Sequence, residues 1–249
     1  MNYKDLALAE EEGKLEAAIA ASRNLLIEAP TGSGKSLFIP YFLSKHCKGR
    51  VVVLQPRRIA ALALAQFSAK LHGESCGKTV GYQFRQDSCK SADTRILFQT
   101  YGNFLQELLH GKLDADWIVF DEYHERKADM DLLFAYFRRE TKDERREMPR
   151  IAVMSAALNR SELETVLGVK CLSLGHPLYP VQIINQTPAT GTSLVSGVGL
   201  DAEVVRALRT LYRNNIWQTT LVFLPGKAEI ARCHTAASEA LGPNCAEFL

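Results

Sequence analysis

The chain has 249 residues, of which 47% are hydrophobic and 23% are charged, and its formal net charge at pH 7 is +2. This length and composition predict a soluble protein of one large or two smaller domains, with enough apolar material for a core. The charge balance is too mild to indicate nucleic-acid binding by itself, so such binding would have to rest on local groups.

Three features argue against a membrane span, secretion and a disulfide framework. No apolar run approaches the ~20 residues that a membrane span needs. Acidic residues at 10–12 follow the first residues at once, which is not the pattern of a signal peptide. No two cysteines form a C-x-x-C pair, which favours reduced thiols in a cytoplasmic protein over disulfides or a zinc site. The cysteines are Cys47, Cys76, Cys89, Cys171, Cys233 and Cys245.

Apolar runs and helical stripes alternate along the first two thirds of the chain. A rough helical stripe over residues 8–19 precedes an expected strand at 24–28. This alternation predicts an α/β fold with an open, mainly parallel sheet and right-handed crossovers. Such sheets bind ligands past the carboxyl ends of their strands. Further strands are expected at 51–54, 95–99, 117–120 and 151–154, and helices at 37–43, 59–71, 102–109 and 130–139.

A Gly-rich loop at 29–36 connects the first strand to the next helix and matches the pattern G-x-x-x-x-G-K-[ST], with Ala29 in the first Gly position. Such a loop turns backbone N–H groups toward a phosphate at the positive end of a helix dipole. We expect Lys35 to reach the β- and γ-phosphates of ATP or another NTP, and Ser36 to bind Mg²⁺. The nucleotide-binding residues expected here are Thr31, Gly32, Ser33, Gly34, Lys35 and Ser36.

Two acidic residues, Asp121 and Glu122, directly follow the apolar strand at 117–120. In a sheet that also carries a phosphate loop, this is the Walker B position. Asp121 is expected to hold Mg²⁺, usually through water, and Glu122 to act as the general base on the attacking water. The expected catalytic residues are therefore Glu122 and Asp121, together with Lys35.

Past residue 174 the pattern changes. Residues 175–198 contain many Pro, Gly, Ser and Thr residues, which predicts a connector. A helix beginning near Asp201, a strand at 219–224 and a helix at 227–241 predict a second α/β unit that has barely begun.

One strand and two helices cannot enclose a core of their own. We therefore expect apolar residues 221–224 to be exposed, and order to be limited beyond about residue 187. The predicted domains are 1–174, a connector at 175–198, and an incomplete domain at 199–249.

The motifs together resemble those of a DEAH-box helicase of superfamily 2. Asp121-Glu122-Tyr123-His124 corresponds to the D-E-x-H box, and the resemblance implies a RecA-like P-loop domain plus the beginning of a second RecA-like domain. The sequences of residues 121–126 and 175–181 are similar to those of the bacterial HrpB-type branch. Supporting matches are 55–58 to motif Ia, 99–102 to motif Ib, 155–157 to motif III and 221–226 to motif IV.

The resemblance implies a track for single-stranded RNA or DNA, ATP with Mg²⁺ as cofactors, and a possible protein activator. Guanidinium groups and hydroxyls bind phosphates without reading sequence. The resemblance also implies that His124 and Ser155 couple the nucleotide state to the partner lobe. The residues it places on the nucleic-acid backbone are Arg57, Arg58, Arg85 and Thr100.

The chain departs from the family pattern in three places. Ala157 replaces a Thr whose hydroxyl ties motif III to motif II. Phe67 stands where an ungapped comparison places an Arg that stacks on the base, although a phenyl ring can also stack there. The chain ends at Leu249, before motifs V and VI with their arginine fingers. The remaining second lobe is therefore expected to be required for activity.

Two alternatives stay open on the sequence. A different P-loop enzyme, such as a small-molecule or nucleoside kinase, would need neither the Walker B Glu nor an arginine pair after the second strand. A truncated or degenerate lobe could bind only nucleotide, nucleic acid or a protein partner without catalysis.

Overall fold

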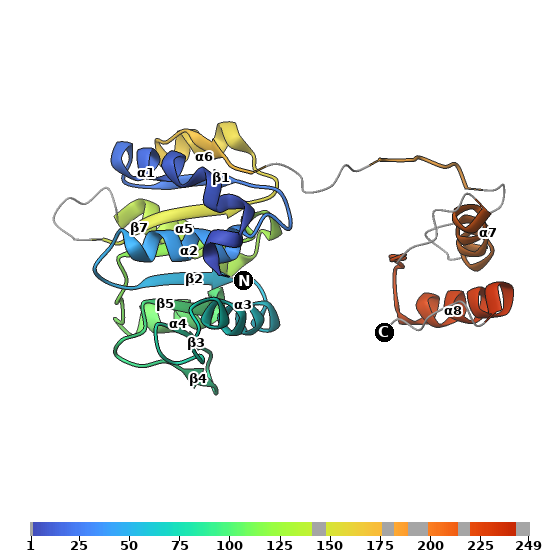
Figure 1. Ribbon diagram of the computed structural model, residues 1–249, viewed down its shortest axis with the longest axis horizontal. Helices are drawn as coiled ribbons and strands as arrows, with labels where there is room; N and C mark the ends of the chain where they lie inside the picture. The colour runs from blue at the N-terminus through green and yellow to red at the C-terminus, as the bar shows by residue number, and fades with distance from the viewer. Residues whose placement is uncertain (1, 141–147, 176–181, 189–198, 214–219, 243–249) are drawn as a thin grey trace. The chain divides into compact units, whose positions relative to one another are not determined.

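The computed structural model describes residues 2–140, 148–175, 182–188, 199–213 and 220–242 (Figure 1). The chain divides into two compact units, Met1–Pro180 and Val181–Leu249, and each is described by itself. Among the described residues, no helix combines the length and the apolar character that crossing a bilayer requires.

The first unit is built on one twisted sheet with the strand order β4-β3-β5-β2-β6-β7-β1-β8 among the described residues. All neighbours pair in parallel except β3 and β4, which are antiparallel. The strands are β1 (Leu25–Glu28), β2 (Val51–Gln55), β3 (Val80–Gln83), β4 (Ser88–Cys89), β5 (Ile96–Thr100), β6 (Trp117–Phe120), β7 (Arg150–Ser155) and β8 (Cys171–Ser173).

Helices cover both faces of this sheet (Figure 1). One face packs against α1 (Glu12–Ala21), α2 (Lys35–Lys45) and α3 (Arg58–Leu71). The opposite face packs against α4 (Tyr101–Leu109), α5 (Ala128–Glu140) and α6 (Arg160–Leu167). Short 3-10 helices are η1 (Tyr3–Asp5), η2 (Ala7–Glu11) and η3 (Tyr123–Glu125).

Strand β2 shows why the sheet lies between two cores. Val51 and Val53 belong to one hydrophobic cluster, whereas Val52 and Leu54 belong to the other. Successive side chains of a strand point to opposite faces, so a strand buried on both sides must be apolar throughout. The predicted α/β fold with an open, mainly parallel sheet is confirmed.

Strands β3, β4 and β8 and helix α6 were not predicted from the sequence. Strand β3 lacks an apolar run because Gly81 interrupts it. A Cβ atom at Gly81 would lie 2.5 Å from the carbonyl oxygen of Cys89, so only glycine allows the β4 segment to approach this closely.

The second unit contains two helices among its described residues, α7 (Leu200–Arg213) and α8 (Lys227–Leu241). They pack together through small and apolar side chains, which include Leu208 and Cys233. Of the predicted connector, residues 182–188 have no regular structure, and 176–181 and 189–198 lie outside the described residues.

The predicted strand at 219–224 is wrong for the residues that the structure describes. Residues 220–224 form no strand, and residue 219 lies outside the described part of the chain. Leu221 and Phe223 are 68% and 86% exposed. A strand needs a neighbour for its backbone hydrogen bonds, and the described residues of this unit supply none.

Candidate functional site

The Gly-rich loop lies at the carboxyl end of β1 and leads directly into α2. Gly32 and Gly34 have φ angles of 80° and 83°, in the left-handed region that glycine adopts without strain. Gly34 is the amino-terminal cap of α2, and its carbonyl accepts hydrogen bonds from the amides of Leu37 and Phe38. The loop therefore presents the amino terminus of a long helix at this edge of the sheet, as a phosphate site requires.

One side chain in the loop has unused hydrogen-bonding capacity. Ser33 is buried, and its hydroxyl oxygen has no hydrogen-bond partner among the described residues. Buried polar atoms are ordinarily paired, so an unpaired hydroxyl in a loop of this shape is suited to a polar ligand.

Asp121 lies at the end of β6 and is completely buried. Its carboxylate accepts hydrogen bonds from Gln55 Nε2, from the Ser36 side chain and from the backbone N–H of Glu122 at 2.9 Å. Burial raises the pKa of this carboxyl, and the Ser36 hydrogen bond opposes that shift. The structure thus brings together the two side chains that the sequence predicted to hold Mg²⁺.

Glu122 faces the lysine of the loop. Lys35 is only 4% exposed, and its Nζ lies 3.3 Å from Glu122 Oε1. A buried cation needs a partner, and Glu122 is that partner. Glu122 has φ 50° and ψ 43°, a left-handed conformation that costs a non-glycine residue on the order of 1–3 kcal/mol.

His124 connects this segment to the end of β7. Its Nδ1 lies 2.9 Å from Ser155 Oγ and 3.5 Å from Glu122 Oε2. Ser155 Oγ also donates to the Ala157 carbonyl at 2.9 Å. Because the serine has one proton, the tautomer with a proton on Nδ1 allows both contacts. Ser155 therefore supplies a hydroxyl contact between the two segments although position 157 has no hydroxyl.

The arginines and the threonine expected on nucleic acid lie at the same edge of the sheet. Arg57 pairs with Glu125 at 3.3 Å and its side chain is 71% exposed. Arg58 pairs with Asp87 at 3.2 Å. The β2 and β5 strands are neighbours, with Gln55 opposite Thr100, so the segments that follow them begin side by side.

Of the remaining three residues expected to bind ligands, Arg85 and Phe67 are exposed and Thr100 is partly buried. Arg85 follows β3 and is exposed. Thr100 accepts a hydrogen bond from the backbone of Asn103 and caps α4. Phe67 lies on α3 and is 39% exposed, and its stacking on a base stays a prediction.

Sequence reasoning gave no role to several residues that support the site. Gln55 is a polar residue at the end of an otherwise apolar, fully buried strand, and that contrast was a usable signal. The Tyr101 hydroxyl donates to the Asp121 carbonyl at 2.7 Å, and burial raises the pKa of this tyrosine. Neither Glu125 nor Lys127 was given a role of its own, because single charged residues outside a motif position carry no distinctive pattern.

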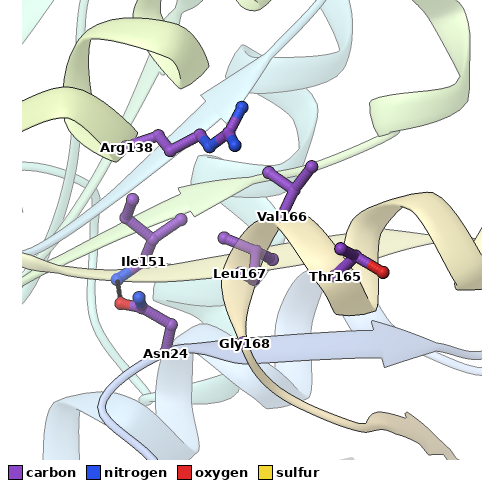
Figure 2. A pocket seen from close by; sticks show the side chains of 7 residues that line it. All are labelled: Asn24, Arg138, Ile151, Thr165, Val166, Leu167 and Gly168. Carbon is purple, nitrogen blue, oxygen red and sulfur yellow. Dashed lines mark hydrogen bonds between the residues drawn. The ribbon is translucent and has the colours of Figure 1, made fainter.

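A separate pocket lies at the amino ends of β1 and β7, on the opposite edge of the sheet from the Gly-rich loop (Figure 2). Its volume is about 300 Å³. Asn24 Oδ1 accepts a hydrogen bond from the Ile151 amide at 3.0 Å, which fixes one wall. The lining residues are Asn24, Arg138, Ile151, Thr165, Val166, Leu167 and Gly168.

Comparison with known families identifies the chain. The family model described as "DEAD/DEAH box helicase" matches residues 14–166, a span that holds both the Gly-rich loop and the Asp121-Glu122 pair. The chain belongs to the DEAD/DEAH box helicase family. The helicase family inferred from the motifs is confirmed.

Individual proteins similar to this chain are also named as helicases. It is 31% identical over 236 residues to "ATP-dependent RNA helicase HrpA" of Borreliella burgdorferi, covering 92% of this chain and 28% of that protein. It is 29% identical over 235 residues to "ATP-dependent RNA helicase HrpB" of Escherichia coli, covering 92% and 28%. The crystal structure of E. coli DExH-box NTPase HrpB matches with a TM-score of 0.77 at 29% identity, covering 96% of this chain and 29% of that one. The chain thus spans less than a third of the length of these relatives.

Proposed function

We propose that this chain is the nucleotide-binding part of a DEAH-type helicase that couples NTP hydrolysis to movement on, or unwinding of, RNA or DNA. The observation that carries the proposal is the meeting of Lys35 and Ser36, from the Gly-rich loop, with Glu122 and Asp121 at the end of β6. A phosphate loop and an acidic strand end in contact are the two parts that NTP hydrolysis requires.

The oxygen atoms at this place fit Mg²⁺. Ser36 offers a hydroxyl, and Asp121 offers a carboxylate that is completely buried. Mg²⁺ prefers oxygen donors and is held by one or two side chains together with the substrate phosphates. When bound, Mg²⁺ would neutralise charge on the β- and γ-phosphates.

The Lys35–Glu122 ion pair has a further role in this proposal. A bound γ-phosphate offers Lys35 a stronger partner than the carboxylate, because charge-assisted contacts to phosphate are strong. Glu122 would then be free to orient the attacking water and accept its proton. The same ion pair satisfies the charge of the buried lysine.

The remaining roles rest on the resemblance and on position. Arg57, Arg58, Arg85 and Thr100 would contact the backbone of a single strand, Phe67 would stack on the base, and residues 199–249 would begin the second lobe. The arginine fingers would come from the rest of that lobe, and such a finger is worth roughly 10³–10⁵ in rate. The chain alone should therefore hydrolyse ATP poorly. A protein activator and a cytoplasmic location belong to the same proposal.

A nucleotide-binding lobe without catalysis is the second candidate. It is favoured by Ala157 in place of threonine, because the hydroxyl that ties motif III to motif II is absent at this position. Steady-state ATPase measurements, with and without single-stranded RNA, on this chain and on a version extended through a second lobe would separate the two. The catalytic proposal predicts stimulated turnover in the extended protein, and its absence there would favour the alternative.

Titration with a fluorescent ATP analogue tests the binding site itself. Replacing Lys35 with Ala should weaken binding by roughly 2–3 kcal/mol, as for other lost charge-assisted contacts. Lys45→Ala is the matched control, since Lys45 lies at the opposite end of the same helix and is exposed. Equal affinity of wild type and Lys35→Ala would place the nucleotide elsewhere.

A further inference from the structure

Glu125 joins the segment after β6 to the segment after β2. It is the last residue of η3, and its Oε1 lies 3.3 Å from a guanidinium nitrogen of Arg57. Its Oε2 lies 3.9 Å from Lys127 Nζ, and that amine donates to the Pro56 carbonyl at 2.7 Å. In the segment that follows β6, Glu125 therefore contacts Arg57 and Lys127 contacts Pro56.

The same short segment begins at the nucleotide site. Glu122, which contacts Lys35, is the residue that caps η3, so only two residues separate the catalytic carboxylate from Glu125. Glu122 and Arg126, at the two ends of η3, are the non-glycine residues with positive φ in the described chain, at 50° and 42°. Strained residues of this kind cluster at active sites and in switch regions, so we expect this segment to be able to change its arrangement.

We propose that Glu125 is a positioning residue that holds Arg57 in an ion pair while no nucleotide is bound and releases it to a nucleic-acid phosphate when nucleotide binds. The proposal rests on the proposed function. When nucleotide binds, Lys35 contacts its phosphates in place of Glu122. The Glu122 carboxylate, at the start of η3, then no longer has a cation beside it, and η3 shifts. Glu125 moves with η3, and the exposed guanidinium of Arg57 becomes available to the strand.

This mechanism couples two sites through contiguous contacts, and the coupling must be reciprocal. Nucleotide should strengthen binding of a single strand, and a single strand should strengthen binding of nucleotide by the same factor. The carboxylate and the strand phosphate compete for one guanidinium, so the carboxylate sets the affinity of the nucleotide-free state.

A neighbouring ion pair offers a matched control. Arg58 pairs with Asp87 at 3.2 Å, a pair of the same kind at the same edge of the sheet. Asp87 lies in the turn between β3 and β4 and not in η3. Asp87→Asn therefore frees an arginine without altering the segment that follows the catalytic carboxylate.

The experiment measures the affinity of a labelled single-stranded oligouridylate at one fixed salt concentration, with and without Mg²⁺ and a non-hydrolysable ATP analogue. Wild type should bind more tightly with the analogue, by roughly fivefold or more. Glu125→Gln should bind tightly in both states, so that the analogue has little further effect. Asp87→Asn should tighten both states alike and leave the analogue's effect as in wild type.

A double variant removes the dependence on any one substitution. In the Arg57→Ala background, Glu125→Gln should not change the oligouridylate affinity, either with or without the ATP analogue, because there is no guanidinium to release. Glu125→Asp, whose shorter side chain withdraws from Arg57, should act like Glu125→Gln and keeps the test open if the glutamine variant does not fold. An equal nucleotide effect in wild type and Glu125→Gln, or a Glu125→Gln effect that persists without Arg57, overturns the proposal.

The outcomes separate this inference from the proposed function. If wild type binds no single strand, or if Lys35→Ala binds nucleotide as well as wild type, the proposed function fails and the inference with it. If wild type binds both ligands, and Arg57→Ala weakens the strand, but Glu125→Gln leaves the nucleotide effect unchanged, only the role of Glu125 is overturned. An oligodeoxythymidylate measured in parallel shows whether the effect depends on the sugar.

Discussion

His124 Nδ1 lies 2.9 Å from Ser155 Oγ, and this contact joins the segment that follows β6 to the end of β7. Glu122 Oε2 lies 3.5 Å from the same nitrogen. The imidazole thus lies between the carboxylate expected to activate water and a buried serine. Any rearrangement of Glu122 on nucleotide binding must alter the surroundings of His124, which gives the two segments a physical connection.

Replacing Ser155 with Ala should lower the free energy of unfolding by about 1–3 kcal/mol. Ser155 is completely buried, and the change removes its hydrogen bonds with the His124 ring and with the backbone amide and carbonyl of Ala157. Denaturant unfolding followed by circular dichroism measures the loss. Ser161→Ala, in the exposed first turn of α6, should change stability little. Equal effects of the two substitutions would show that the buried hydroxyl is not a structural link.

The Asp121 carboxyl should make stability depend on pH in a defined direction. Burial raises its pKa above the ordinary value, so the folded protein binds this proton more tightly than the unfolded chain does. The stability it contributes is present below the unfolded pKa and is lost as the pH rises through the higher folded pKa.

Asparagine does not titrate, so the free energy of unfolding of Asp121→Asn, measured relative to wild type, should increase as the pH rises through that window. Urea unfolding in metal-free buffer at a series of pH values measures the difference. A difference that stays constant with pH, or that decreases, would contradict the raised pKa.

The main part of the fold could be predicted because apolar runs mark strands that are buried on both faces. Residues 117–120 and 51–54 carry no polar residue, and both are central strands. The β8 strand has a half-exposed edge position, and β3 contains a glycine, so neither has a run of this kind. The strand expected at 219–224 failed because an apolar run predicts burial, whereas burial depends on a partner that the local sequence does not contain.

In the candidate site too, residues marked by a local pattern could be predicted, whereas contacts between distant segments could not. Spacing within one loop was enough to find Lys35 and Ser36, because helix geometry and phosphate shape fix that spacing. Two further partners of Asp121, Gln55 and Tyr101, come from β2 and α4. A contact between residues 66 positions apart, such as Gln55 with Asp121, leaves no local pattern. The ion pair between Arg57 and Glu125 was out of reach for the same reason.

Glu122→Gln should keep nucleotide affinity within a few-fold of wild type and slow hydrolysis by roughly 10²–10⁴ in a protein that includes the complete second lobe. The amide retains the shape of the side chain but cannot accept the proton of the attacking water. Single-turnover ATP hydrolysis, together with nucleotide titration, distinguishes the two effects. Unchanged turnover would show that another group is the base.

The arginines expected to contact nucleic acid should give an affinity for single strands that falls with salt and depends little on base sequence. Replacing Arg57, Arg58 or Arg85 with Ala should each reduce the slope of log K against log salt by roughly one unit. Lys70→Ala, in the last turn of α3, is an exposed control at the far end of the helix that Arg58 begins. A slope unaffected by the three arginine substitutions would place the strand on another surface.

The most direct test of the nucleotide site is the effect of Mg²⁺ on ATP-analogue affinity in wild type and in Asp121→Asn. We expect that removing Mg²⁺ weakens binding to wild type strongly and has little further effect on Asp121→Asn, because Ser36 and Asp121 together would hold the ion. Isothermal titration calorimetry with and without Mg²⁺ gives the four affinities. An equal Mg²⁺ effect in the two proteins would contradict the assignment of the metal to the end of β6.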